Sequence, residues 1–281
     1  MSLASIDKWL LSRSARSSCT KIQAFVYEFW IFGLKQIRAC LFVGLFFAAV
    51  FITPRSGLFG IARYDLLLIW ALAIQICMLI SRLETWDEVK AIGLFHLIGF
   101  VLEVFKTSGA IQSWSYPDAA YTKLFGVPLF AGFMYAAVGS YIIQAWRLFD
   151  LKIRHHPTYW ISTLIAILIY ANFFTHHYIG DYRWYLAAFA LGLYSRTMVT
   201  YSPANKERQM PLLLAFVLIG FFIWLAENFS TFFGLWRYPN QLGAWSLVHL
   251  GKWSSWSLLV IMTITIVTNL KHYKKTIHVP D

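Results

Sequence analysis

Long runs of apolar residues dominate this chain and limit what it can fold into. A membrane-spanning helix needs about 20 mostly apolar residues, and in lipid its backbone groups must be satisfied within the helix. We therefore expect an all-α polytopic membrane helix bundle with about eight transmembrane helices. The sixth run is short and contains Arg196, so seven spans is the alternative. The runs are approximately 37–53, 65–81, 91–106, 124–147, 159–175, 184–201, 211–229 and 244–270.

The charge pattern supports a membrane protein and predicts its orientation. Apolar residues make up 59% of the chain and charged residues 13%, whereas soluble domains average roughly 45–50% and about 25%. These values exclude a disordered chain and a secreted disulfide scaffold. The net charge of +11 does not indicate nucleic-acid binding, because the basic residues lie between the apolar runs. With eight spans, 17 Lys and Arg fall on one side and 6 on the other, which predicts that both termini are cytoplasmic.

Four short motifs recur in the same order in the two halves of the chain. The second copies follow the first at offsets of 114, 121, 124 and 122 residues. This spacing predicts two parallel four-helix repeats, related by an axis along the membrane normal. The alternative is a duplicated bundle whose repeated motifs only cap helices. The matching pairs are 79–82 with 193–196, 97–100 with 218–221, Glu103 with Glu227, and 114–117 with 236–239.

The repeat divides the chain into four parts. We expect residues 1–36 to form an interfacial amphipathic segment, because apolar side chains recur at helical spacing between Ile22 and Phe32. The two predicted repeats cover residues 37–147 and 159–270, and residues 271–281 form a predicted basic cytoplasmic tail.

Ionisable and aromatic side chains collect at the predicted outer ends of the spans. An ionisable residue inside a span costs a few kcal/mol, so it normally faces the bundle interior and finds a partner. We expect two glutamates to face each other beneath two aromatic segments that fold back over them. The candidate catalytic residues are Glu103, Glu227, Lys106, His249 and Lys252. The candidate substrate-binding residues are Trp114, Tyr116, Trp236, Arg237, Tyr238, His176 and His177.

Each of these signals also has a simpler interpretation. Glu103 and Lys106 are spaced as an i,i+3 ion pair near the interface. The adjacent His176 and His177 point to different helix faces and could form a water-facing pair, and the aromatic segments could belong to an interfacial belt. His96, alone in the middle of a span, is expected to be a hydrogen-bonded packing residue.

The sequence predicts no metal site and no cofactor. Glu84, Asp87 and Glu88 fall at i, i+3 and i+4, but no second acidic cluster completes a cation shell. We expect these carboxylates to form a solvated, salt-bridged cytoplasmic face. Three widely spaced cysteines make neither a disulfide framework nor a zinc site: Cys19, Cys40 and Cys77.

Several stretches carry a resemblance to known families. LFHLIGFVLEVFK, GVPLFAGFMYAAVGSYIIQAWR and AENFSTFFGLWRYPNQ resemble an uncharacterised bacterial family of multi-pass membrane proteins known only by a domain-of-unknown-function label. This resemblance covers nearly the whole chain after residue 35 and implies a multi-pass protein of the bacterial cytoplasmic (inner) membrane. An embedded Glu followed by an aromatic-x-Tyr segment and Gly126-Val127-Pro128 is similar to the membrane lycopene cyclase and carotenoid hydratase group. The second half has Gly243-Ala244-Trp245 at the corresponding place.

We expect a membrane protein whose outer-leaflet polar site binds or acts on a lipid or isoprenoid, so that membrane lipid is its partner. Redox-neutral acid–base chemistry suits the site if it is catalytic, because a buried protonated glutamate could donate a proton to a double bond. The alternatives are a small-solute or ion transporter and a structural protein without catalysis. A cavity that opens sideways to lipid would favour the lipid-directed protein. A polar path through both faces would favour the transporter, and the absence of a cavity would favour the structural protein. The oligomeric state stays open.

Overall fold

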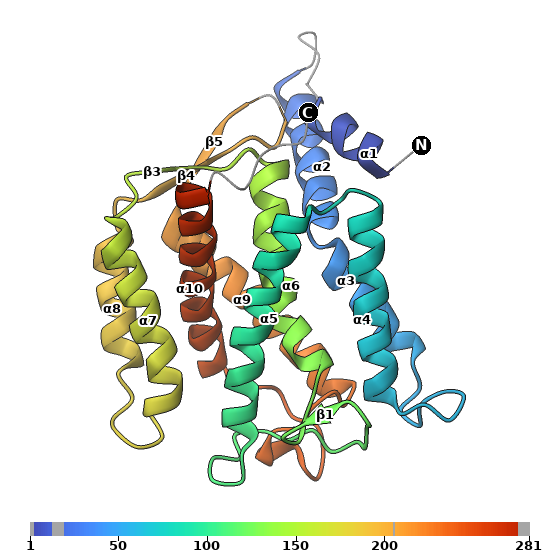
Figure 1. The fold of residues 1–281 in the computed structure, drawn as a ribbon. Coiled ribbons are helices and arrows are strands. Elements are labelled where there is room, and N and C mark those ends of the chain that lie inside the picture. The colour runs from blue at the N-terminus through green and yellow to red at the C-terminus, as the bar shows by residue number, and fades with distance from the viewer. Residues whose placement is uncertain (1–2, 13–19, 205, 275–281) are drawn as a thin grey trace.

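The computed structural model describes residues 3–12, 20–204 and 206–274, which are mostly helical. A small sheet lies at each end of the helical bundle (Figure 1). The helices are α1 (Leu3–Leu11), α2 (Lys21–Ala39), α3 (Leu41–Ile52), α4 (Arg63–Ile80), α5 (Trp86–Thr107), α6 (Phe130–Leu148), α7 (Tyr159–Thr175), α8 (Arg183–Tyr194), α9 (Leu212–Phe232), the short 3₁₀ helix η1 (Pro239–Gln241) and α10 (Gly251–Lys274). The strands are β1 (Lys123–Leu124), β2 (Val127–Pro128), β3 (Lys152–Arg154), β4 (Met198–Tyr201) and β5 (Arg208–Pro211).

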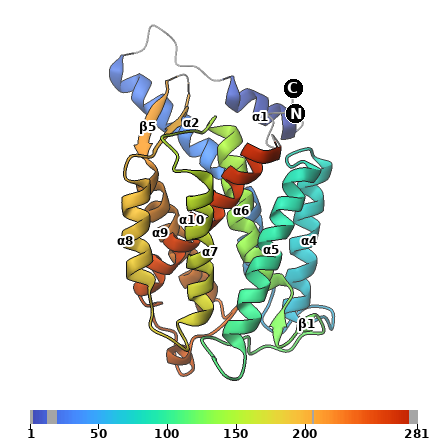
Figure 2. The same cartoon turned by 60° about the vertical axis from the view of Figure 1, so that its left-hand side comes forward.

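Successive helices run back and forth through the same bundle. The pair α2–α3, then α4, α5 and α6, alternate in direction, and α7 to α10 repeat this alternation (Figures 1 and 2). The β3–β4–β5 sheet and the end of α10 lie at one end, which we call the sheet end. The loops 108–122 and 233–250 lie at the other, which we call the aromatic-loop end. Helices α5 and α9 therefore both run toward the aromatic-loop end.

Three described helices are long and apolar enough to cross a membrane, namely α4, α9 and α10. A fourth crossing results if α2 and α3, which bend by 64° where they meet, count as one span. Helix α5 carries charges near both of its ends, and α7 has only 17 residues. Neither is therefore a candidate membrane span by length and composition. The molecule is thus a mostly helical protein with three or four candidate membrane spans.

Three predicted spans differ from the helices of the structure by six or seven residues at one end. The predicted span 184–201 is wrong beyond Tyr194, where α8 ends, because residues 198–201 form β4 between β3 and β5. The β-branched and aromatic residues of this segment favour a strand. The predicted spans 124–147 and 244–270 begin only at Phe130 and Gly251, since a β1–β2 hairpin and an irregular loop precede them.

Two glycines allow the helices of each half to approach closely. Helix α5 packs on α6, and α9 packs on α10. A Cβ at Gly99 would lie 2.2 Å from the Tyr135 ring, and a Cβ at Gly220 would lie 2.4 Å from the Ser257 hydroxyl. Small residues at such contacts are the usual means of close helix packing in membranes. Both glycines belong to the repeated motif at 97–100 and 218–221.

The acidic cluster at the sheet end is buried, which corrects the expectation of a solvated face. Glu84 and Glu88 are 2% and 3% exposed. Glu84 accepts a hydrogen bond from the Ser140 hydroxyl at 2.6 Å, and Glu88 pairs with Arg147 at 3.4 Å. Only Asp87 of the three points to the outside. A capping box at the start of α5 turns Glu88 back toward the chain, and the partners that bury both carboxylates come from α6.

The cysteines, the predicted tail and His96 are the remaining predicted features. Cys19 and residues 275–281 of the predicted tail lie outside the described residues. Cys40 and Cys77 are free thiols. His96 packs edge-on against Phe133, with ring centroids 4.7 Å apart, but its Nδ1 is buried without the hydrogen bond that we expected.

Candidate functional site

Glu103 is held by three neutral donors inside the bundle. It lies near the end of α5 and is 3% exposed. Its Oε2 accepts hydrogen bonds from the indole of Trp114 at 2.7 Å and the hydroxyl of Tyr116 at 2.8 Å. Its Oε1 accepts one from the Tyr135 hydroxyl at 2.8 Å. Burial, and then the charge of Glu103, raise the pKa of Tyr116 well above its usual 10, so this hydroxyl stays a donor at neutral pH.

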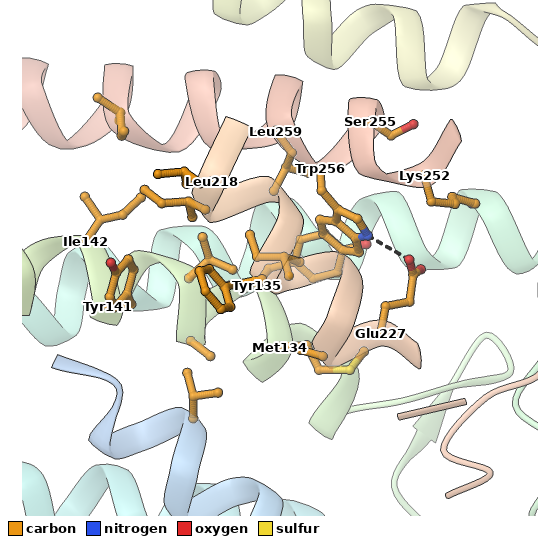
Figure 3. A pocket seen from close by; sticks show the side chains of 18 of the residues that line it. Met134, Tyr135, Tyr141, Ile142, Leu218, Glu227, Lys252, Ser255, Trp256 and Leu259 are labelled. Atoms are coloured by element: carbon orange, nitrogen blue, oxygen red, sulfur yellow. Dashed lines mark hydrogen bonds between the residues drawn. The ribbon is translucent and has the colours of Figure 1, made fainter. Parts of the chain in front are cut away.

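Glu227 has a similar environment in the second half. It lies near the end of α9 and is 4% exposed. Its Oε1 accepts a hydrogen bond from the Tyr238 hydroxyl, and its Oε2 accepts one from the Trp256 indole at 2.8 Å (Figure 3). Burial, and then the charge of Glu227, raise the pKa of Tyr238 far above its usual value. We expected a carboxylate paired with a cation, but among the described residues both carboxylates bond only to aromatic donors.

The two aromatic segments pair with each other. The Ser115 N–H donates to the Arg237 carbonyl and the Arg237 N–H donates to the Ser115 carbonyl, each at 2.9 Å. These bonds join the segment after α5 to the segment after α9, so one aromatic cover lies beside both carboxylates. The side chain of Arg237 forms no ion pair with a described carboxylate. The crossed ring pairs have centroids 6.0 and 6.5 Å apart, Trp114 with Tyr238 and Tyr116 with Trp236.

Lys252 lies between the two aromatic segments. Its Nζ is 4.8 Å from the Trp114 ring centroid and 4.7 Å from that of Tyr238. Such contacts hold a cation by its attraction to the ring faces. His249 precedes α10, and its Nδ1 accepts the N–H of Gly251 at 3.0 Å. This bond leaves the Nε2 of His249 as the donor nitrogen of a neutral ring.

Lys106 contacts two histidines and does not form the ion pair with Glu103 that their i,i+3 spacing allows. It is 5% exposed, and its Nζ lies 3.3 Å from Nε2 of His176 and 2.7 Å from Nε2 of His177. An ammonium group can only donate, so both imidazoles must accept and are therefore neutral. Burial, and then the charge of Lys106, lower the pKa of His177 to about 4, in agreement with that state. In the part of the chain that the structure describes, no carboxylate lies within ion-pair distance of Lys106.

A cavity of about 1110 Å³ joins these groups. It follows α6 from Met134 to Trp146, a rise of about 18 Å. Figure 3 shows Lys252 and Glu227 at one end of this space and Ile142 toward the other. The predicted site residues Tyr116, Arg237 and His177 do not line it. Those that do are Glu103, Glu227, Lys106, His249, Lys252, Trp114, Trp236, Tyr238 and His176.

The middle of the cavity is apolar and reaches the side of the bundle. Leu218 and Phe222 on α9 line it and are themselves 43% and 65% exposed. Phe47 on α3 lines it as well.

Three residues of the site escaped the sequence analysis: Tyr135, Trp256 and Arg183. Tyr135 and Trp256 lie on the fourth helix of each predicted repeat, 121 residues apart, and bond to the two glutamates. The repeat offset could have identified them. Arg183 begins α8 and lines the cavity. Among residues 3–12, 20–204 and 206–274, no group of three His, Cys, Asp or Glu could hold a metal ion.

Comparison with known proteins places this chain in a family. The family model described as "Protein of unknown function (DUF817)" matches residues 28–264, which include every candidate site residue. The chain belongs to this family. It is also similar to the "Uncharacterized protein YoaT" of Bacillus subtilis (strain 168), with 50% identity over 244 residues, 87% of this chain and 92% of that protein. No solved structure matches. The resemblance to an uncharacterised bacterial family is confirmed, whereas neither match extends to lycopene cyclases, so that likeness stays a prediction.

Proposed function

We propose that the chain crosses the membrane eight times, as two parallel four-helix halves over residues 37–147 and 159–270. The alternating helix directions support this count, which exceeds the spans recognised by length and composition alone. In each half, a tyrosine of the loop that follows donates a hydrogen bond to the glutamate: Tyr116 to Glu103 and Tyr238 to Glu227. A duplicated gene would produce this correspondence.

The orientation is a testable part of this proposal. The excess of Lys and Arg at the sheet end predicts that this end is cytoplasmic in the bacterial inner membrane. Reporter fusions at residue 205 and at the C-terminus should therefore give a cytoplasmic signal, and fusions at residues 118 and 240 a signal from the opposite side. A C-terminus outside the cytoplasm would contradict the eight-span topology.

The protein's function, we propose, is to bind a long-chain lipid or isoprenoid in the cavity. The observation that carries this proposal is the cavity itself, which combines an apolar interior with polar groups at the aromatic-loop end. Its course along α6 covers more than half of the roughly 30 Å hydrocarbon thickness of a bilayer. A ligand with one long apolar chain and one polar end fits both features. Leu218 and Phe222 line the cavity and are also exposed, which supports entry from the lipid phase.

Glu227 is the group best suited to exchange a proton with such a ligand. It lines the cavity and has two donors, whereas Glu103 accepts three hydrogen bonds and is closer to saturation. A carboxyl in an apolar site retains its proton more readily and can act as a general acid. Glu227 would then protonate a double bond of the lipid, and Glu103 would stabilise the carbocation that forms. Loss of a proton from the neighbouring carbon back to the Glu227 carboxylate would shift the double bond and restore the acid.

The binding proposal is tested by lipid retention. Wild-type protein purified in mild detergent should carry a long-chain lipid that survives to mass analysis, at about one molecule per chain. Ala226→Phe introduces a ring into the cavity beside Glu227 and should reduce the retained lipid at least tenfold. Ala48→Phe makes the same change at an exposed position on α3 that does not line the cavity, and it should retain lipid normally. Equal retention by both variants would overturn the proposal.

The acid–base part has its own test. Lipid extracts of cells that lack this gene should differ from the parent in one long-chain species. Wild-type protein should restore that species, and Glu227→Gln, which binds but cannot donate the proton, should not. If Glu227→Gln also restores that lipid species, the acid–base role of Glu227 is wrong and only lipid binding stands.

The transporter alternative is less well supported. A path for ions or small solutes needs polar groups along its length. Here the middle of the cavity is lined by side chains such as Ile142, Leu218 and Leu259, and the ionisable side chains cluster at the aromatic-loop end.

A further inference from the structure

Three cations from three helices line the polar end of the cavity: Lys106 of α5, Arg183 of α8 and Lys252 of α10. Lys252 and Arg183 lie close enough to Lys106 for their charges to act on it. One guanidinium nitrogen of Arg183 donates to the Gly251 carbonyl at 3.3 Å, which ties the start of α8 to the start of α10 beside Lys252. The like charges are therefore held together by the fold.

Two of the three cations have no direct ion-pair partner among the residues that the structure describes. Arg183 pairs with Asp181 at 3.2 Å, but in the described part of the chain no carboxylate lies within ion-pair distance of Lys106 or Lys252. Glu103 and Glu227 act on Lys252 from further away, and their oxygens are occupied by aromatic donors. Lys106 contacts only neutral imidazoles.

Arg183 contributes charge rather than a free donor to this end of the cavity. Its Nε is buried without a hydrogen-bond partner among the described residues, so it is also shielded from the cavity. Its other two guanidinium nitrogens contact the Gly251 carbonyl and Asp181.

We infer that the polar end of the cavity binds the phosphate group of a long-chain phosphate ester. This inference rests on the lipid-binding function proposed above and names the chemistry of the ligand's polar end. A phosphate offers three acceptor oxygens and up to two negative charges, which suits a guanidinium and two ammonium groups approaching from three helices. A carboxylate has two acceptor oxygens and one charge and matches this set less well. The Nε2–H of His249 is a further donor at the same end.

The experiment compares amphiphiles that share one chain and differ in the polar end. Binding of hexadecyl phosphate, hexadecanoate, hexadecanol and hexadecyltrimethylammonium is measured on the full-length protein in lipid nanodiscs, with inorganic phosphate as a separate ligand. The phosphate ester should bind about 10- to 100-fold more tightly than the alcohol, as expected for charge-assisted hydrogen bonds. It should also bind more tightly than the carboxylate. Inorganic phosphate should bind far more weakly than the ester, because it buries no chain.

Variants locate the effect. Lys106→Gln and Lys252→Gln should each remove about tenfold or more of the preference for phosphate over alcohol, with little change in alcohol binding. Lys106→Arg keeps the charge and should keep most of the preference, which separates a charge effect from misfolding. Arg55→Gln removes a cation in the loop between α3 and α4, outside the cavity, and should leave the preference unchanged.

The outcomes distinguish the two proposals. If the alcohol binds as tightly as the phosphate ester, the headgroup inference is wrong while lipid binding stands. If the carboxylate or the trimethylammonium compound binds best, the inference is also overturned. If no amphiphile binds and inorganic phosphate does, the lipid-binding function itself fails.

Discussion

Glu103→Ala should lower the free energy of unfolding by about 3–5 kcal/mol, which makes it the most damaging single change expected at the site. The substitution removes one acceptor and leaves three donors unsatisfied, on the buried Tyr116 and Tyr135 and on the partly buried Trp114. The loss is measured by thermal unfolding of the purified protein in detergent. Glu103→Gln should cost less, because its amide oxygen still accepts.

Two comparisons make this prediction specific. Glu207→Ala removes an exposed carboxylate that pairs with Lys152, and it should change the free energy of unfolding by less than about 1 kcal/mol. A double-mutant cycle of Glu103→Gln with Tyr116→Phe should give a coupling energy of about 1–3 kcal/mol. Additive effects in that cycle would mean that the Glu103–Tyr116 bond contributes nothing to stability.

Gly220→Ala should also be strongly destabilising, by about 1–3 kcal/mol. Its new Cβ would lie 2.7 Å from the backbone nitrogen and 2.9 Å from the Cα of Ser257, so α9 and α10 would have to separate. Gly192→Ala is the matched control, because nothing lies within 4 Å of the Cβ it adds on α8. There the better helix propensity of alanine should stabilise the protein by up to about 1 kcal/mol. Thermal unfolding of the two variants in the same detergent gives the comparison, and equal effects would contradict close packing at Gly220.

The equivalent change in the first half should reach the site itself. A Cβ at Gly99 would contact the ring of Tyr135, whose hydroxyl bonds to Glu103. The ring would have to move, and its hydrogen bond to the carboxylate would lengthen or break. Gly99→Ala should therefore impair lipid retention as well as stability.

The sequence predicted a mostly helical protein with apolar spans and singled out most residues of the candidate site, because both depend on strong local signals. Apolar runs without charges leave few options for a backbone in lipid. The two glutamates stood out because a carboxylate inside such a run requires a partner. The partners differ from the expected cations, since neutral indole and hydroxyl groups of Trp114, Tyr116 and Tyr238 satisfy the carboxylates.

Other features depended on contacts between distant segments. The β-branched and aromatic residues of β4 favour a strand but also fit the end of an apolar span, and its partner β3 lies 44 to 48 residues earlier in the chain. Glu84 and Glu88 appeared exposed because their spacing fits a solvated helix face. Their partners on α6, Ser140 for Glu84 and Arg147 for Glu88, can be identified only from the fold.

The central claim is that the cavity between α6, α9 and α10 holds a long-chain lipid with its polar end at Lys252. The most direct measurement is a cryo-electron microscopy map of the full-length protein in nanodiscs made from native lipid. The account predicts elongated density along α6, from Met134 toward Trp146, with its polar end within hydrogen-bond reach of Lys252. An empty cavity, or a row of ordered waters running through it to the sheet end, would contradict the account.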